Sequence, residues 1–199
     1  MKQIEEYNID FSSTSLDIQV QEFFQYYDMP QIAVHSFEVA NEAKKMAEIY
    51  KVSTKKAYIA GLLHDISAVI PNGERIEIHK KLGEQIYPEE KQLPMLLHQK
   101  QSVWIAKEFF YVKDCDVLCA IGCHTTLKKN ASELDKVVYL ADKIKWDRGY
   151  TPPYLNELTV NLKESLDAAC RVYIKWALSD VVVLHPYLKD AINDLKFIE

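Results

Sequence analysis

The sequence predicts an all-α protein, and three observations support that fold class. Glycine and proline are scarce, at 5 and 7 of 199 residues, which disfavours a loop-rich or all-β chain. Hydrophobic residues make up 48% of the chain, enough for a sizeable core. Apolar residues recur at steps of three and four, the period of an amphipathic helix. We therefore expect a single domain over residues 1–199, built as a bundle of about eight helices.

Two helices are expected within the first 50 residues. Residues 1–15 are polar and rich in Ser and Thr, which predicts a loosely ordered lead-in. Over 17–27 the apolar side chains fall on one helical face. Pro30 suits the first turn of the next helix, over 31–50. His35 lies on the inward stripe of that helix, where a lone histidine is more often a hydrogen-bonded core residue than a ligand.

The third helix ends in an unusual pair of residues. Ser53 or Thr54 is expected to cap its start, and an apolar run over 57–63 stops abruptly at His64-Asp65. Charged groups are seldom buried without a partner, because desolvation costs several kcal/mol. A metal ion would satisfy both side chains at once, although capping of a buried helix through hydrogen bonds would also explain the pair.

The rest of the chain continues the helical pattern. Residues 67–73 form a turn, and 74–94 hold short helical pieces interrupted by glycine and proline. Further helices are expected at 96–111, 114–124 (capped by Asp114), 132–142 (capped by Ser132), 152–176 and after Pro186. His124 and Asp142 are 18 residues apart, or about 27 Å along one unbroken helix. They can share a site only if residues 125–131 reverse the chain.

The charge balance and the absence of long apolar segments bear on the partners and the compartment of this chain. With 24 Lys and Arg against 29 Asp and Glu, the formal charge is −5, which argues against nonspecific binding to nucleic acid or anionic membrane. No apolar segment of about 20 residues is present. The acidic start at 1–6 lacks the apolar core of a signal peptide, so we expect a cytoplasmic protein whose four cysteines stay reduced.

Six residues of the types that bind metals lie at internal helix positions: His35, His64, Asp65, His98, His124 and Asp142. Nitrogen and carboxylate ligands without thiolate suit iron, manganese, zinc, cobalt or nickel. Six ligands exceed what one structural zinc needs. They fit one crowded site, or two metals that share a carboxylate. Asp65 is the candidate bridge, because neighbours on a helix point about 100° apart.

The ligand order His, then adjacent His-Asp, then a later Asp resembles the HD phosphohydrolase superfamily. The two further histidines, the phrase His124-Thr125-Thr126 and the phrase Tyr-Leu-Ala-Asp-Lys-Ile over 139–144 narrow the resemblance. They look like the bacterial HD-type symmetrical dinucleoside-tetraphosphate hydrolases, over an HD core of about 30–185. The resemblance implies a dinuclear, iron-containing site that cleaves diadenosine tetraphosphate, a small-molecule nucleotide, into two ADP. Another divalent or mixed-valence centre, of manganese, cobalt, nickel or zinc, stays open.

The resemblance also implies roles for individual residues. Asp65, His98 and His124 are expected to be catalytic as well as metal-ligating. Four residues are expected to meet substrate phosphate: Arg148 first, Lys143 second, then Thr125 and Thr126. The two threonines would either hydrogen-bond a phosphate oxygen or orient His124.

The chain departs from the family pattern at three of its substrate-facing positions. Ala68 stands where the family has lysine, and Gln99 and Leu127 stand where it has glycine. His79, in a charged stretch, is expected in solvent, and His185 outside the site. Two alternatives remain open: another HD-type nucleotide phosphatase or phosphodiesterase, and a non-catalytic, metal-containing nucleotide-binding protein. Whether the chain forms a homodimer is also open.

Overall fold

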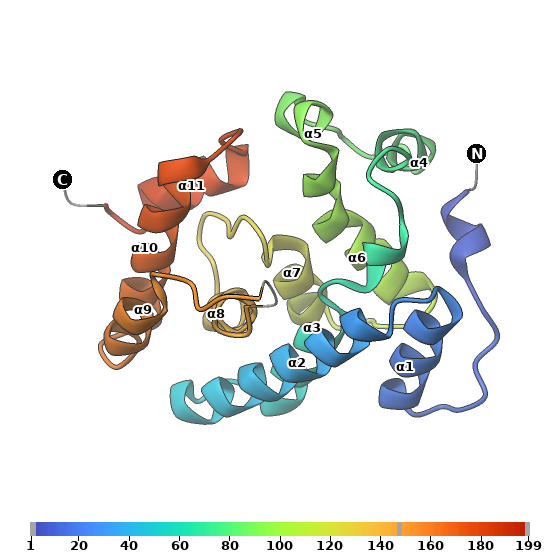
Figure 1. The fold of residues 1–199 in the computed structure, drawn as a ribbon, viewed down its shortest axis with the longest axis horizontal. Coiled ribbons are helices and arrows are strands. Elements are labelled where there is room, and N and C mark those ends of the chain that lie inside the picture. Colours follow the sequence, from blue (N-terminus) through green and yellow to red (C-terminus); the bar gives the residue numbers. More distant parts are fainter. Residues whose placement is uncertain (1–2, 147–148, 198–199) are drawn as a thin grey trace.

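The structure, a computed structural model, describes residues 3–146 and 149–197 and is built from helices (Figure 1). Within these ranges there are eleven α-helices, four short 3-10 helices and no strand. The α-helices are α1 (Leu16–Tyr26), α2 (Pro30–Tyr50), α3 (Thr54–Leu63), α4 (Arg75–Lys81), α5 (Pro88–Gln92), α6 (His98–Glu108), α7 (Cys115–Cys123), α8 (Glu133–Ile144), α9 (Leu155–Leu162), α10 (Leu166–Ala177) and α11 (Pro186–Asp194). The 3-10 helices are η1 (Ile4–Tyr7), η2 (Ile66–Val69), η3 (Pro94–Leu97) and η4 (Leu178–Asp180). The prediction of an all-α fold is confirmed.

The expected number of about eight helices is wrong, for two local reasons. The helix expected over 152–176 is interrupted at Ser165, whose backbone is extended and whose Oγ accepts a hydrogen bond from the amide of Ala168 at 3.0 Å. This serine therefore caps a new helix, α10, instead of continuing α9. The short helical pieces that were expected over 74–94 are two separate helices, α4 and α5, which add to the count.

Three predicted helix caps are confirmed. Ser53 Oγ accepts from the amide of Lys56, Asp114 caps α7, and Ser132 forms a reciprocal capping box with Asp135. The chain reverses between α7 and α8, as expected. The evidence is that these two helices pack against each other. Two residues of this reversal adopt the left-handed backbone conformation, Leu127 at φ 57° and Asn130 at φ 52°.

The core forms where α2 packs against α3 and α8, while α7 contacts α3, α6 and α8. The approach of α2 and α3 is close at Gly61, where an added Cβ would lie 2.8 Å from the Cα of Ala40. Any larger residue would force the two helices apart. Figure 1 shows η1 and α1 at one end of the molecule and α9, α10 and α11 at the other.

The segment expected to be a loose lead-in contributes to the core. Ile4 and Tyr7 are only 2% and 3% exposed, and the hydroxyl of Tyr27 donates to the Tyr7 carbonyl at 2.8 Å. No helix within the described residues has both the length and the apolar character needed to cross a membrane.

Candidate metal centre

Helix ends position three of the predicted ligand residues. His64 and His124 are the C-cap residues of α3 and α7, and His98 is the first residue of α6. The C-terminus of a helix carries partial negative charge from its free carbonyls. Two such termini therefore converge on one place, which favours a cation there.

One group of side chains gathers around Asp142, in the last turn of α8. Its Oδ1 atom lies 3.3 Å from Nε2 of His35, which comes from the second turn of α2. The same oxygen lies 3.6 Å from Nε2 of His64. The ligand atoms of these three residues are close enough together to hold one metal ion.

A second group gathers around Asp65, which directly follows His64. Its Oδ1 atom lies 3.3 Å from Nε2 of both His98 and His124. Its Oδ2 atom lies 3.5 Å from Nε2 of His64. The two oxygens of Asp65 thus face different histidines, and His64 stands between the two groups. All six residues singled out in the sequence lie together in one cluster.

Backbone carbonyls determine which nitrogen of three histidines faces the centre. The Nδ1 atoms of His64, His98 and His124 each lie 2.7 Å from a carbonyl oxygen three residues earlier, those of Gly61, Met95 and Ile121 respectively. A carbonyl can only accept, so each Nδ1 carries the proton. Each Nε2 therefore presents a lone pair to the centre, which is the usual form of a metal-ligating histidine.

The donor atoms fit a metal ion because hydrogen bonds within the protein do not account for all of the histidine nitrogens that face the centre. Nε2 of His64 is buried and has no hydrogen-bond partner among the described residues. Nε2 of His98 lies 2.9 Å from Nε2 of His124, although both nitrogens are acceptors in the tautomers set by their carbonyls. Such an arrangement is unfavourable unless a cation lies against the two lone pairs.

The electrostatics of the centre also favour a cation. Burial raises the pKa of Asp65 and of Asp142, but the surrounding imidazoles, and Lys143 for Asp142, outweigh burial and hold both pKa values well below the usual range. Burial also works against protonation of His64, yet Asp65 and Asp142 raise its pKa to about 9. Two ionised carboxylates thus lie beside His64 and hold a positive charge there, and a bound metal ion would take the place of its Nε2 proton.

A pocket of about 550 Å³ opens onto these two groups. Its lining includes five of the six candidate ligands, together with Thr125 and Lys143. Thr125 Oγ1 lies 3.0 Å from Nε2 of His98. Nζ of Lys143 lies 2.5 Å from Oδ2 of Asp142, and this carboxylate raises the pKa of the lysine against the opposing effect of burial. Both residues are therefore placed where a substrate phosphate could meet them.

Of the other two expected phosphate contacts, one lies away from the pocket and the structure does not describe the other. Thr126 is 2% exposed, does not line the pocket, and donates to the carbonyl of Leu127 and to Oε1 of Gln99. Thr126 therefore supports the turn that follows His124. This position suits the second role expected for it, which was to orient His124. Arg148 lies outside the described residues.

The expectation that His79 is solvated is wrong. Its side chain is fully buried, with Nε2 3.6 Å from Glu84, and burial lowers its pKa. His185 lies outside the cluster but is also buried, with Nε2 3.2 Å from Oε1 of Glu90. The charged residues next to His79 in the sequence had suggested that it is exposed. A helix can, however, bury one face while its charged residues occupy the other.

Sequence reasoning also missed a buried arginine behind the centre. Arg75 is 4% exposed, and it donates to Oε1 of Gln101 at 2.6 Å and to the carbonyl of Ser67 at 3.1 Å. Ser67 in turn donates from Oγ to the carbonyl of His98 at 2.8 Å. This chain of bonds joins the turn after Asp65 to the start of α6. The sequence around Arg75 is charged, so nothing in it indicates that this arginine is buried and links the two segments.

Leu127 shows why the chain can differ from the family's glycine at this position. The left-handed backbone conformation strains any residue with a Cβ by about 1–2 kcal/mol. However, the Leu127 side chain is fully buried, and burying a leucine contributes about 1.5–3 kcal/mol. The strain is therefore offset by packing, and the turn that carries Thr125 keeps its shape.

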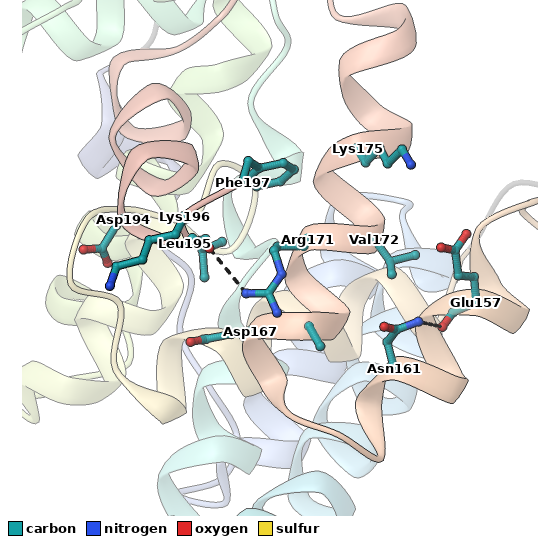
Figure 2. Close-up of a pocket in the computed structure, with 11 residues that line it drawn as sticks. Glu157, Asn161, Asp167, Arg171, Val172, Lys175, Asp194, Leu195, Lys196 and Phe197 are labelled. Carbon is teal, nitrogen blue, oxygen red and sulfur yellow. Dashed lines mark hydrogen bonds between the residues drawn. The ribbon is translucent and has the colours of Figure 1, made fainter. Parts of the chain in front are cut away.

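A second hollow, of about 580 Å³, lies beside α9, α10 and the end of α11 (Figure 2). Its charges are mixed, from Arg171, Lys175, Lys196, Glu157, Asp167 and Asp194. Arg171 is engaged with the carbonyl of Leu195, to which it donates at 3.3 Å. The described residues that line it include no histidine, so it lacks the ligand pattern of the centre.

Comparison with known proteins places these features in a family. A protein from Halalkalibacterium halodurans named bis(5'-nucleosyl)-tetraphosphatase, symmetrical, is 32% identical over 139 residues, 68% of this chain and 71% of that one. A protein from Lactococcus lactis subsp. cremoris, described as lying in the pepC 5' region, is 42% identical over 146 residues, 73% of this chain and 75% of its own.

A crystal structure from Clostridium acetobutylicum, titled as a predicted HD superfamily hydrolase involved in NAD metabolism, superposes with a TM-score of 0.80 at 31% identity. The superposition covers 89% of this chain and 95% of that one. The HD domain model matches residues 32–147, more than half of the chain. The chain therefore belongs to the HD-domain family of hydrolases.

Proposed function

We propose that this chain is a metal-dependent hydrolase that cleaves dinucleoside tetraphosphates symmetrically into two nucleoside diphosphates, with diadenosine tetraphosphate as the main substrate. The proposal treats residues 1–199 as one HD domain. One observation carries it above the others: Asp65 presents one oxygen to His64 and the other to His98 and His124. This arrangement supports a role for Asp65 as a carboxylate that two metal ions would share.

The ions would be held by His35, His64, Asp65, His98, His124 and Asp142. We propose a dinuclear iron site, because nitrogen and carboxylate donors without thiolate suit iron, and they suit manganese as the nearest substitute. When bound, such ions supply positive charge to phosphoryl oxygens and lower the pKa of water.

The chain's own side chains would position the polyphosphate. Lys143 is held by Asp142 and by the rings of Tyr139 and Tyr173, whose centroids lie 5.3 and 5.4 Å from its Nζ. A cation fixed in this way can meet a phosphate oxygen without losing further side-chain freedom. Thr125 Oγ1 adds a hydroxyl donor beside His98. Arg148 remains our proposal for a further cationic contact.

In the proposed reaction, water adds to one of the two central phosphorus atoms. The bond from that phosphorus to the central bridging oxygen breaks, and each half leaves as a nucleoside diphosphate. The name of the Halalkalibacterium halodurans relative supports this outcome. A phosphatase or phosphodiesterase of the same family, or a nucleotide-binding protein without turnover, would use the same centre differently.

Product analysis separates these alternatives. Protein loaded with iron or manganese is incubated with diadenosine tetraphosphate, and the products are resolved by anion-exchange chromatography. Two equivalents of ADP support the proposal, whereas AMP with ATP contradict the symmetrical cleavage. Release of phosphate from a mononucleotide, with the tetraphosphate left intact, would assign the chain to the phosphatases instead.

A further inference from the structure

The pocket that opens onto the metal centre has a second wall made of aromatic rings. Trp146, Tyr150, Tyr173 and Trp176 line it, alongside the candidate ligands. Tyr150 is 56% exposed, and both tryptophans are partly exposed. Rings that only completed the core would be buried on all sides, so these surfaces are available to a ligand.

The rings are held rigidly from behind. Tyr154 is 3% exposed and packs against Trp176 with ring centroids 4.6 Å apart, and against Tyr173 at 5.0 Å. Its hydroxyl also donates to the carbonyl of Lys143 at 2.9 Å. Trp146 lies 5.8 Å from Trp176, edge to face. A surface ordered in advance binds a flat ligand without the entropy cost of immobilising its own side chains.

The wall has a direction set by helix α10 and η4. Tyr173, Trp176, Ala177 and Asp180 all line the pocket, and their spacing of three, four and seven residues places them on one helical face. From Tyr173 to Asp180 this face runs about 10 Å. Tyr173 is at the end next to Lys143, whose Nζ lies 5.4 Å from its ring. Asp180 is at the other end.

This order matches the parts of a nucleotide. Lys143 and the candidate metal centre occupy the end that favours phosphate. The carboxylate of Asp180 would repel phosphate at the other end. Between them, Trp176 offers an aromatic face and Ala177 leaves room beside it. Bases stack on such rings whatever their identity, because every base has a π-face.

We infer that the wall formed by Trp146, Tyr150, Tyr173 and Trp176 is a nucleobase subsite, which holds one base of the substrate while its phosphates reach the metal centre. The inference rests on the proposed function for the phosphate end. The subsite itself requires only that a nucleoside phosphate be bound.

The test compares two diphosphates that differ by a nucleoside. Calorimetry measures the dissociation constants (Kd) of ADP and of inorganic pyrophosphate for manganese-loaded protein. We expect the native chain to bind ADP more tightly than inorganic pyrophosphate. Trp176→Ala weakens ADP binding by about 5- to 150-fold, equivalent to about 1–3 kcal/mol for loss of one stacked base, and leaves the Kd of pyrophosphate within about twofold. Trp176→Phe keeps most of the ADP affinity.

Two further variants keep the result interpretable. Tyr150→Ala removes an exposed ring that carries little of the fold, and it weakens ADP selectively by a smaller factor. Trp104→Ala is the matched control, because Trp104 packs against Phe109 and does not line the pocket. It leaves both dissociation constants unchanged.

The outcomes separate this inference from the proposed function. Unchanged ADP binding in Trp176→Ala and Tyr150→Ala, or equal weakening of ADP and pyrophosphate in both, overturns the subsite even if the tetraphosphate is still hydrolysed. Selective loss of ADP binding by a protein that does not hydrolyse the tetraphosphate keeps the subsite and overturns the proposed reaction.

Discussion

Among the residues that the structure describes, the cluster around Glu90 and the cluster around Asp65 and Asp142 both combine buried histidine with carboxylate, and they differ in whether their hydrogen bonds are complete. In the first, Glu90 accepts from Lys100 at 2.8 Å, from the amide of Tyr87 at 2.7 Å and from His185 at 3.2 Å. Nδ1 of His185 in turn accepts from the amide of Tyr187 at 3.2 Å. Every polar group named here has a partner, so this cluster is complete without a ligand.

In the second cluster the donors and acceptors do not match. Nε2 of His98 and Nε2 of His124 face each other as two acceptors, and Nε2 of His64 has no hydrogen-bond partner in the described chain. A buried histidine next to a carboxylate is therefore not by itself a sign of a metal site. What distinguishes the second cluster is that several histidines with unmatched ring nitrogens surround the same two carboxylates.

The largest expected effect concerns the complete cluster. Glu90→Ala leaves Lys100 and His185 buried without their carboxylate, and breaking a buried ion pair costs about 3–5 kcal/mol. We expect the free energy of unfolding, measured with urea, to fall by about that amount. Metal content per folded molecule stays unchanged. A loss of metal without a loss of stability would mean that the two clusters have been assigned the wrong way round.

The next effect concerns the carboxylate between the two groups of histidines. Asp65→Ala removes an oxygen donor from both, so metal content falls and turnover of the tetraphosphate drops at least about 100-fold, the upper end of the effect of indirect metal partners. The melting temperature of metal-loaded protein falls too, because bound metal stabilises the folded state. Asp116→Ala is the matched control, because Asp116 lies on the exposed face of α7. It should leave metal content and turnover unchanged.

A moderate gain is expected at Ala68. Lys128 is paired with the buried Asp135 at 2.9 Å and does not line the pocket, so we do not expect it to replace the lysine that the family resemblance implies at position 68. Ala68→Lys would add a charge-assisted contact to phosphate, and we expect a rise in turnover of about tenfold. Ala68→Met, of similar length but uncharged, should show no rise. Equal rates for the two variants would show that position 68 does not meet the substrate.

The smallest effect on catalysis is expected at His185. His185→Ala removes one partner of Glu90, which costs about 1–3 kcal/mol of stability. Turnover per folded molecule stays within about threefold, because His185 is not part of the metal centre. His124→Ala is the contrasting variant, with a loss of at least about tenfold in metal affinity or turnover. Similar catalytic losses in both would remove the distinction between the clusters.

Local signals in the sequence predicted most of the helices, and the order of histidine and aspartate singled out six residues that the structure brings together. The caps at Ser53, Asp114 and Ser132 are properties of a few neighbouring residues, and the structure has them as expected. The break before α10 escaped notice because no glycine or proline marks it, and the apolar stripe continues across Ser165. Local sequence cannot reveal a turn whose only signal is a common serine.

Features made by distant segments were beyond sequence reasoning. The aromatic wall joins Trp146 and Tyr150 to two rings of α10, and Glu90 meets His185 across 95 residues of chain. Burial of His79 depends on which face of α4 meets the core, which its charged neighbours conceal. Whether residues 1–199 form a single domain stays a prediction.

Elemental analysis tests the central claim most directly. The chain is purified without chelator, loaded with iron or manganese, desalted and analysed by inductively coupled plasma mass spectrometry beside Asp65→Ala and Glu90→Ala. The unused acceptors around Asp65 and Asp142 predict about two metal ions per native chain, fewer in Asp65→Ala, and the native number in folded Glu90→Ala. A native chain that retains no metal, or an Asp65→Ala variant that retains as much as the native chain, would contradict the account.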